Sequence, residues 1–324
     1  MAQSSLRMGL ALPTGNGERL LLGVQCFALL AMAASVATRV WQDHIWFGVV
    51  LIAFAVAVWA PEFTRRRDRL AWFFYVTGTF AYTLLRAVAD ETAIVVRTQY
   101  VINFDAALPG SSVVPLLQKW REAWEFHRLV DYFAIGTHWS YFILPHAAAV
   151  AIFIARRRAF PRYVGVMVLS VWLGLLLFFL VPTVPPWLAG EQGDLPGVVR
   201  VMDERVRGAL EGKDAGATYD ELYKGLGEPN SVAAMPSIHM AITFAMFLWS
   251  LRYARRFAPW LLAYAILMGF SLAYLGEHYL ADELVGITVA TVSWLVVLRL
   301  PFLRPGPRGD PVAVAPGSPA PDAA

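Results

Sequence analysis

The chain has 324 residues, of which 58% are hydrophobic and only 16% are charged. A soluble domain of this length carries about 25% charged residues, so the composition excludes an ordinary soluble protein. The net charge of +3 is small and favours a membrane topology over a nucleic-acid-binding surface. Apolar surface on this scale needs lipid as its partner, and we expect the chain to cross a membrane several times.

Eight apolar windows along the chain are candidates for transmembrane helices. A membrane helix needs about 20 mostly apolar residues. Because backbone groups in lipid must be hydrogen-bonded internally, such windows fold as helices and not as open strands. The windows are 20–40, 44–60, 70–89, 133–155, 163–181, 232–253, 258–275 and 280–298. The predicted fold class is therefore all-α, a polytopic transmembrane helix bundle of about eight spans.

These windows divide the chain into four parts. We expect a disordered N-terminus at 1–18, two additional transmembrane helices at 19–61, a six-helix catalytic domain at 70–300 and a disordered cytoplasmic tail at 301–324. The long connections 90–132 and 182–231 fall on one face. The first contains a segment with the apolar spacing of an amphipathic surface helix.

Arginine clusters indicate how the bundle is oriented in the membrane. They recur in every second connection and after the last window, at Arg65, Arg66, Arg67, Arg69, Arg156, Arg157, Arg158, Arg162, Arg252, Arg255, Arg256, Arg299, Arg304 and Arg308. With eight spans, all of these clusters and both termini share one face. The positive-inside rule makes that face cytoplasmic, and we expect the protein in the cell membrane.

Ionisable residues in or beside the spans gather at the opposite, extracytoplasmic ends. Such residues are functional candidates, because burying an ionisable group in lipid is costly. Three separate pieces of chain deliver two His, one Asp and one Arg to one membrane depth. The full set of candidates is Arg86, Asp90, His138, Ser237, His239, His278 and Asp282. This convergence predicts an active site at the outer face.

The segment AAMPSIHM has the features of a helix start that binds an anion. Pro236 suits the first turn of a helix, and the unpaired N–H groups that follow would point outward. Ser237 adds a hydroxyl donor and His239 an imidazole. The alternative is an ordinary membrane helix with a polar cap.

In the segment EHYLADELVG, His278 and Asp282 are four residues apart and share a helix face. A carboxylate on one ring nitrogen leaves the other free as a nucleophile or base. The same pair could instead only anchor two helices. A zinc site made of two His and one Asp is a third interpretation, although no HExxH or paired-Cys spacing supports it.

The remaining candidates each have two interpretations. Arg86 could pair with Asp90 at i+4 or neutralise a bound phosphate, for which a guanidinium is well suited. His138 is either an interfacial ring or a substrate contact. His127 and His146 are interpreted as structural.

The motif PSIH, followed by Ser271, His278 and Asp282 in the pattern S-x6-H-x3-D, resembles the type-2 phosphatidic acid phosphatase superfamily. The second and third signatures of that family read P-S-x-H and S-R-x5-H-x3-D. The pattern HY-x2-D and the stretches YTLLRAVAD, PTVPPWLA and NSVAAMPSIHMA look most like the inositol phosphorylceramide synthase-like branch. The resemblance covers residues 82–286. The chain departs from the wider family at Leu272, where an Arg is usual, and it lacks a clear K-x6-R-P signature.

The resemblance implies a metal-independent lipid phosphatase or phosphotransferase without a cofactor. His278 would attack phosphorus, Asp282 would orient it, and His239 would act as general acid and base. Ser237, Arg86, Asp90 and His138 would contact the phosphate or substrate. The substrate would be a membrane lipid phosphate or phospholipid, with water or a polar alcohol as acceptor. A transporter or flippase, or a non-catalytic scaffold with the same fold, are the alternatives.

Overall fold

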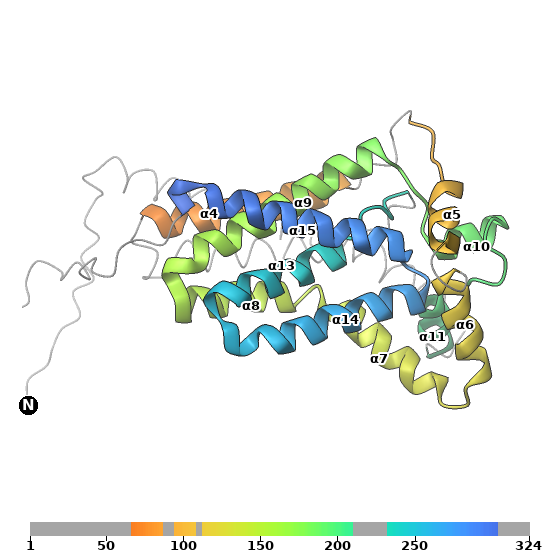
Figure 1. Cartoon of the computed structure of the whole chain (residues 1–324). Helices are drawn as coiled ribbons and strands as arrows, with labels where there is room; N and C mark the ends of the chain where they lie inside the picture. The colour runs from red at the N-terminus through yellow and green to blue at the C-terminus, as the bar shows by residue number, and fades with distance from the viewer. Residues whose placement is uncertain (1–65, 87–93, 108–111, 210–231, 304–324) are drawn as a thin grey trace, which may run out of the picture.

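The computed structural model describes residues 66–86, 94–107, 112–209 and 232–303 of the chain. Within these ranges the regular structure is helical, and an isolated parallel bridge joins Thr183 to Ala233. The longer helices run side by side (Figure 1) and are α4 (Arg66–Arg86), α7 (His127–Ser140), α8 (Leu144–Arg156), α9 (Phe160–Leu180), α13 (Ile238–Tyr253), α14 (Ala258–Leu275) and α15 (Leu280–Arg299). The predicted all-α class is thus confirmed for the described ranges.

Four short helices gather at one end of this bundle, beside the ends of α14 and α15 (Figure 1). We call them the cap: α5 (Gln99–Ala107), α6 (Val113–Ala123), α10 (Pro186–Gln192) and α11 (Val201–Ala209). The single-turn helices η2 (Arg157–Ala159), η3 (Arg255–Phe257) and η4 (Pro301–Leu303) lie at the other end. Three of the predicted arginine clusters therefore share the end opposite the cap. Which end faces the cytoplasm stays a prediction.

Three helical stretches in the described ranges are long and apolar enough to cross a membrane: Leu144–Leu180, Arg255–Leu275 and Leu280–Arg299. The first of these combines α8 and α9 through η2, which reverses the chain direction. The predicted count of about eight spans is not confirmed. The windows at 20–40 and 44–60 lie outside the described residues.

Two predicted spans have different boundaries in the structure. The window 133–155 is interrupted, because α7 ends at Ser140 and α8 begins only at Leu144, with Pro145 in its first turn. The window 232–253 is helical only from Ile238. Its first residues are not helical, and Val232 and Ala234 exchange backbone hydrogen bonds with Thr183. Apolar composition alone could not place these breaks.

The central helix of the bundle is α13, which packs against α9, α14 and α15. Helix α4 packs on α9, and α7 packs on α14. The contact between α13 and α15 is close at Gly286, where an added Cβ would lie 2.4 Å from the Ser237 carbonyl oxygen. The starts of these two helices are therefore held side by side at the cap end.

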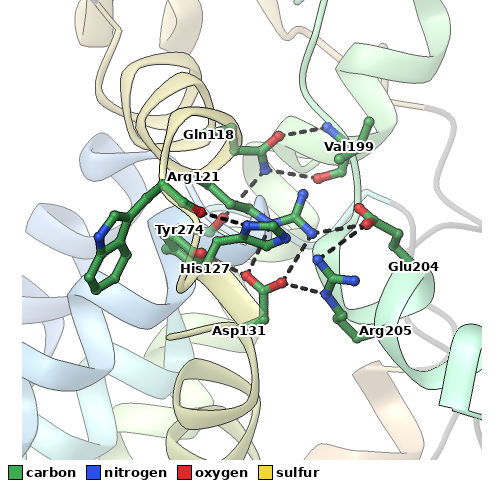
Figure 2. Close-up of polar contacts among 9 residues, drawn as sticks. Gln118, Arg121, His127, Asp131, Val199, Glu204, Arg205 and Tyr274 are labelled. Atoms are coloured by element: carbon green, nitrogen blue, oxygen red, sulfur yellow. Dashed lines mark hydrogen bonds and ion pairs between the residues drawn. The ribbon is translucent and has the colours of Figure 1, made fainter. Parts of the chain in front are cut away.

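The cap is fastened to the bundle by buried polar contacts (Figure 2). The Gln118 side chain of α6 accepts a hydrogen bond from the Val199 N–H and donates to its carbonyl, both at 2.9 Å. Arg121 of α6 contacts the buried Asp131 of α7 at 2.9 Å, and Tyr274 of α14 donates to the same carboxylate at 2.6 Å. These bonds fix the cap over the ends of α7 and α14.

Candidate active site

The turn between α14 and α15 places His278. Gly276 ends α14 with φ of +79°, a left-handed conformation that glycine adopts without strain. The Leu272 carbonyl then accepts hydrogen bonds from the N–H groups of Glu277 at 2.9 Å and His278 at 3.3 Å. The chain reverses within these few residues, so that His278 stands just before α15.

Asp282, in the first turn of α15, orients the His278 ring. Its Oδ2 atom lies 3.3 Å from His278 Nδ1 and accepts a second hydrogen bond from the Tyr279 N–H at 2.9 Å. The same carboxylate thus caps the helix and holds the imidazole. Asp282 is fully buried and His278 is 7% exposed, so water screens this interaction little.

The start of α13 brings His239 to the same place. Ser237 is the N-cap, and its hydroxyl oxygen accepts a hydrogen bond from the Met240 N–H at 3.3 Å. The Ser237 N–H donates to the Asp282 carbonyl at 2.9 Å, which ties α13 directly to α15. Because His239 lies in the first turn of α13, this bond sets its position relative to His278.

The three histidine rings of the site form a cluster. The ring centres of His239 and His278 are 5.7 Å apart, and those of His138 of α7 and His239 are 4.7 Å apart. Tyr141 also contacts His239, at 4.3 Å between ring centres. The Nε2 atom of His239 is buried and has no hydrogen-bond partner among the described residues. That nitrogen is available to carry a proton to or from a substrate.

A cavity of about 180 Å³ opens beside the cluster, between α4, α8, α9 and α13. Its lining includes both His239 and His278, together with Arg86 at the end of α4. A guanidinium and two imidazoles that face one cavity can hold a phosphate and exchange protons with it. The structure therefore brings together four residues that the sequence singled out, His239, His278, Asp282 and Arg86.

The other predicted site residues have different surroundings. Ser237 and His138 are buried next to the cavity, but neither is part of its lining. Asp90 lies outside the described residues, so its pairing with Arg86 is not tested. Leu272 is fully buried in the bundle. Because leucine is uncharged, this position supplies no cation to the cavity.

Several lining residues were not selected from the sequence. Tyr75, Thr79, Tyr82 and Thr83 of α4 line the cavity below Arg86. His146, which we had interpreted as structural, lines it too and lies 2.8 Å from the Tyr75 hydroxyl through Nδ1. The sequence contains one signal that could have identified the α4 residues, because polar side chains recur on one face of this otherwise apolar segment.

A buried ion pair lies directly before His278. Arg200 binds Glu277 at 2.8 Å and stacks on Trp187, with 4.6 Å between the guanidinium carbon and the ring centre. Burial raises the pKa of Glu277, but Arg200 first, and then His138 and His278, outweigh burial and leave the pKa below its usual 4.5. The Glu277 carboxylate therefore lies within electrostatic reach of the histidine cluster.

Within the described ranges, no group of three or more His, Cys, Asp or Glu side chains is arranged to hold a metal ion. The prediction that the reaction needs neither metal nor cofactor stays a prediction.

Comparison with known proteins gives one match. The family model of the PAP2 superfamily matches residues 99–296, which include the PSIH segment and both His278 and Asp282. No curated protein and no solved structure matches the chain. The matched region is more than half of the sequence and contains the histidine cluster with its supporting helices. The chain belongs to the PAP2 superfamily.

Proposed function

We propose that this protein is a lipid phosphatase or phosphotransferase of the membrane that works through a phospho-histidine intermediate on His278. The observation that carries the proposal is the meeting of the His278–Asp282 pair with His239 and Arg86 at one cavity. PAP2 membership supports phosphatase-type chemistry on a lipid phosphate. The buried site at the cap end fits a phosphate that enters from the membrane surface.

In the first step, His278 acts as the nucleophile. Its Nδ1–H donates to Asp282, so the lone pair is on Nε2. The Nε2 atom forms a bond to phosphorus while the ester P–O bond breaks, and the bond electrons leave with the alcohol oxygen. His239 gives its proton to that oxygen. Asp282 stabilises the positive imidazolium, and Arg86 offsets the phosphate charge.

In the second step, neutral His239 takes a proton from the incoming water or alcohol. The oxygen attacks phosphorus, the N–P bond breaks and its electrons return to His278 Nε2. Both histidines then have their starting protonation. Water as acceptor yields a phosphatase and an alcohol yields a transferase, as in the inositol phosphorylceramide synthase-like branch that the motifs resemble. Phosphoryl transfer needs mainly positioning and charge stabilisation, which these residues supply.

The arginine clusters support a location at the outer face of the cell membrane. Arg157, Arg255 and Arg299 lie at the end of the bundle opposite the cap. If the positive-inside rule holds, the cap and the histidine cluster are extracytoplasmic and both termini are cytoplasmic.

The test is turnover of lipid phosphates by the full chain in detergent, with His278→Ala, His239→Ala and the control His127→Ala. His127 is in the first turn of α7 and bonds to the Trp124 carbonyl, away from the cavity. We expect both site variants to lose at least about 100-fold in kcat, the usual contribution of one acid–base or nucleophilic group. His127→Ala should retain activity.

The covalent step has its own readout. Brief reaction with a ³²P-labelled lipid phosphate should leave an acid-labile label on the wild type and none on His278→Ala. Normal turnover by His278→Ala would refute the nucleophile assignment. Normal turnover by His239→Ala would refute only the role of His239.

A further inference from the structure

The two histidines of the proposed reaction are held in different ways. The His278 ring pairs with the Asp282 carboxylate at 3.3 Å. Among the described residues no carboxylate pairs with the His239 ring, and its Nε2 atom is buried without a hydrogen-bond partner. A general acid must direct one nitrogen at the reacting oxygen, and a small error in that direction is costly. Contacts other than an ion pair must therefore keep the His239 ring in place.

Three aromatic side chains of one short segment lie against the His239 ring. Its ring centre is 4.3 Å from that of Tyr141, 4.7 Å from that of His138 and 6.1 Å from that of Phe142. Aromatic rings interact up to about 7 Å between centres. The plane of the His239 ring is inclined by 35° to that of His138 and by 88° to that of Phe142. Neighbours at such different inclinations leave the imidazole less room to rotate than a single stacked ring would.

The break between α7 and α8 holds these three residues together. His138, Tyr141 and Phe142 are spaced i, i+3 and i+4, which places side chains on one face of a helix. Helix α7 ends at Ser140, but the turn that follows preserves this spacing. In that turn the Tyr141 N–H donates to the His138 carbonyl at 3.2 Å, and the Phe142 N–H donates to the Trp139 carbonyl at 3.1 Å. The break in the apolar window therefore presents three rings to His239 as one unit.

The same break is anchored to α14, on which α7 packs. Ser140 Oγ donates to the Thr137 carbonyl at 2.6 Å, so in its contact of 2.9 Å with the Tyr264 hydroxyl of α14 the tyrosine is the donor. His138 is buried and does not line the cavity. A side chain that contacts His239 but not the cavity can act on a substrate only through His239.

We propose that His138, Tyr141 and Phe142 form a ring cage that positions His239, with its Nε2 atom directed at the reacting oxygen. The three are positioning residues, and His138 acts through its ring and not as a contact of the substrate. The proposal rests on the proposed function, since it takes His239 as the general acid and base. It gives the break between α7 and α8 a role in catalysis.

The main test compares the loss of a cage ring with its replacement by another ring, in lipid phosphate turnover by the full chain in detergent. Tyr141→Leu and His138→Leu should each lower kcat about tenfold and leave KM nearly unchanged, because His239 acts in the transition state. Tyr141→Phe and His138→Phe keep a ring and should retain most of kcat. Phe133→Leu is the matched control, because it removes a ring of α7 that is 54% exposed and outside the cavity lining. It should behave as wild type.

A double-variant cycle decides whether the ring cage acts through His239. Tyr141→Leu added to His239→Ala should cause no further loss of kcat, because the imidazole that the cage holds is already absent. A ring that contacted the substrate directly would lower the residual activity again. Such a further loss, or equal losses in His138→Phe and His138→Leu, would overturn the ring cage.

A spectroscopic measurement separates the ring cage from the catalytic proposal. In protein with ring-¹³C-labelled histidine, the NMR signal of His239 is the one that His239→Ala removes. This signal should move in Tyr141→Leu, whereas the His127 signal should stay. The result needs no turnover. If wild-type protein turns over no lipid phosphate but the His239 signal moves as expected, the catalytic proposal fails and the ring cage stands. If turnover depends on His239 but kcat ignores the loss of the cage rings, only the ring cage fails.

Discussion

Replacing Asp131 by Asn should weaken the attachment of the cap to the bundle and destabilise the protein. Asp131 is completely buried and accepts hydrogen bonds from Arg121 Nε at 2.9 Å and Arg121 Nη2 at 3.1 Å. It also accepts from Arg205 and, at 2.6 Å, from the Tyr274 hydroxyl (Figure 2). In the variant an uncharged amide faces two guanidinium groups, and of the groups that bond Asp131 only the Tyr274 hydroxyl oxygen can accept from its NH₂.

The expected loss is large because the remaining charges stay buried. Arg121 is 6% exposed, and removing one partner from a buried ion pair costs about 3–5 kcal/mol of unfolding free energy. For a chain of this size that corresponds to a fall in Tm of roughly 10 °C. The measurement is the midpoint of thermal unfolding in detergent, followed by intrinsic tryptophan fluorescence.

Glu204→Gln is the matched control for this prediction. Glu204 belongs to the same cluster and lies 3.0 Å from Arg121, but its side chain is 46% exposed. An exposed partner in an ion pair contributes at most about 1 kcal/mol to the free energy of unfolding. The Tm of the Glu204→Gln variant should therefore fall by only a few degrees. Equal shifts in Asp131→Asn and Glu204→Gln would show that burial does not set the strength of this cluster.

Three further outcomes can be checked by thermal unfolding. Gly286→Ala should destabilise the protein by about 1–3 kcal/mol and lower kcat, because its Cβ would lie 2.4 Å from the Ser237 carbonyl and push α13 off α15. Asp105→Ala and Asp105→Asn should each cost about 1–2 kcal/mol, because two N–H groups of α15 donate to different carboxylate oxygens, Oδ1 at 3.0 Å and Oδ2 at 3.2 Å, and an amide offers only one oxygen. The folded pKa of Glu277 lies below 4.5, so its ion pair with Arg200 stabilises above that pH and is lost as the pH falls through the folded pKa. Glu277→Gln should therefore lower the Tm at neutral pH and leave it unchanged at strongly acidic pH. A Tm difference between the variant and the wild type that stays the same at every pH would contradict this.

The sequence could predict the catalytic candidates because their arrangement depends largely on local spacing along the chain. His278 and Asp282 are four residues apart, and their Nδ1 and Oδ2 atoms are 3.3 Å apart although His278 precedes α15 instead of sharing a helix face with Asp282. Pro236 and Ser237 indicated a helix start, and α13 begins directly after them. The contact between His239 and His278 required one more assumption, that both helices start at the same membrane depth. The hydrogen bond from the Ser237 N–H to the Asp282 carbonyl shows how that is achieved.

The sequence alone could not predict the features that depend on tertiary contacts. The chain turns at 141–143, within the predicted window 133–155, and composition cannot show this because both sides are apolar. The position of His138 beside His239 follows from how α7 packs on α14, which no local spacing encodes. The same holds for His146, whose partner Tyr75 is 71 residues away.

The site has two supports that are structurally independent. The turn that holds His278 is fixed by the cap, through the Trp187 N–H to the Gly276 carbonyl at 3.0 Å and through the ion pair of Arg200 with Glu277. The side of the cavity made by Tyr75, Thr79, Tyr82, Thr83 and Arg86 belongs to α4, which packs mainly on α9. A substitution on the α4 side of the cavity should therefore leave the position of His278 unchanged.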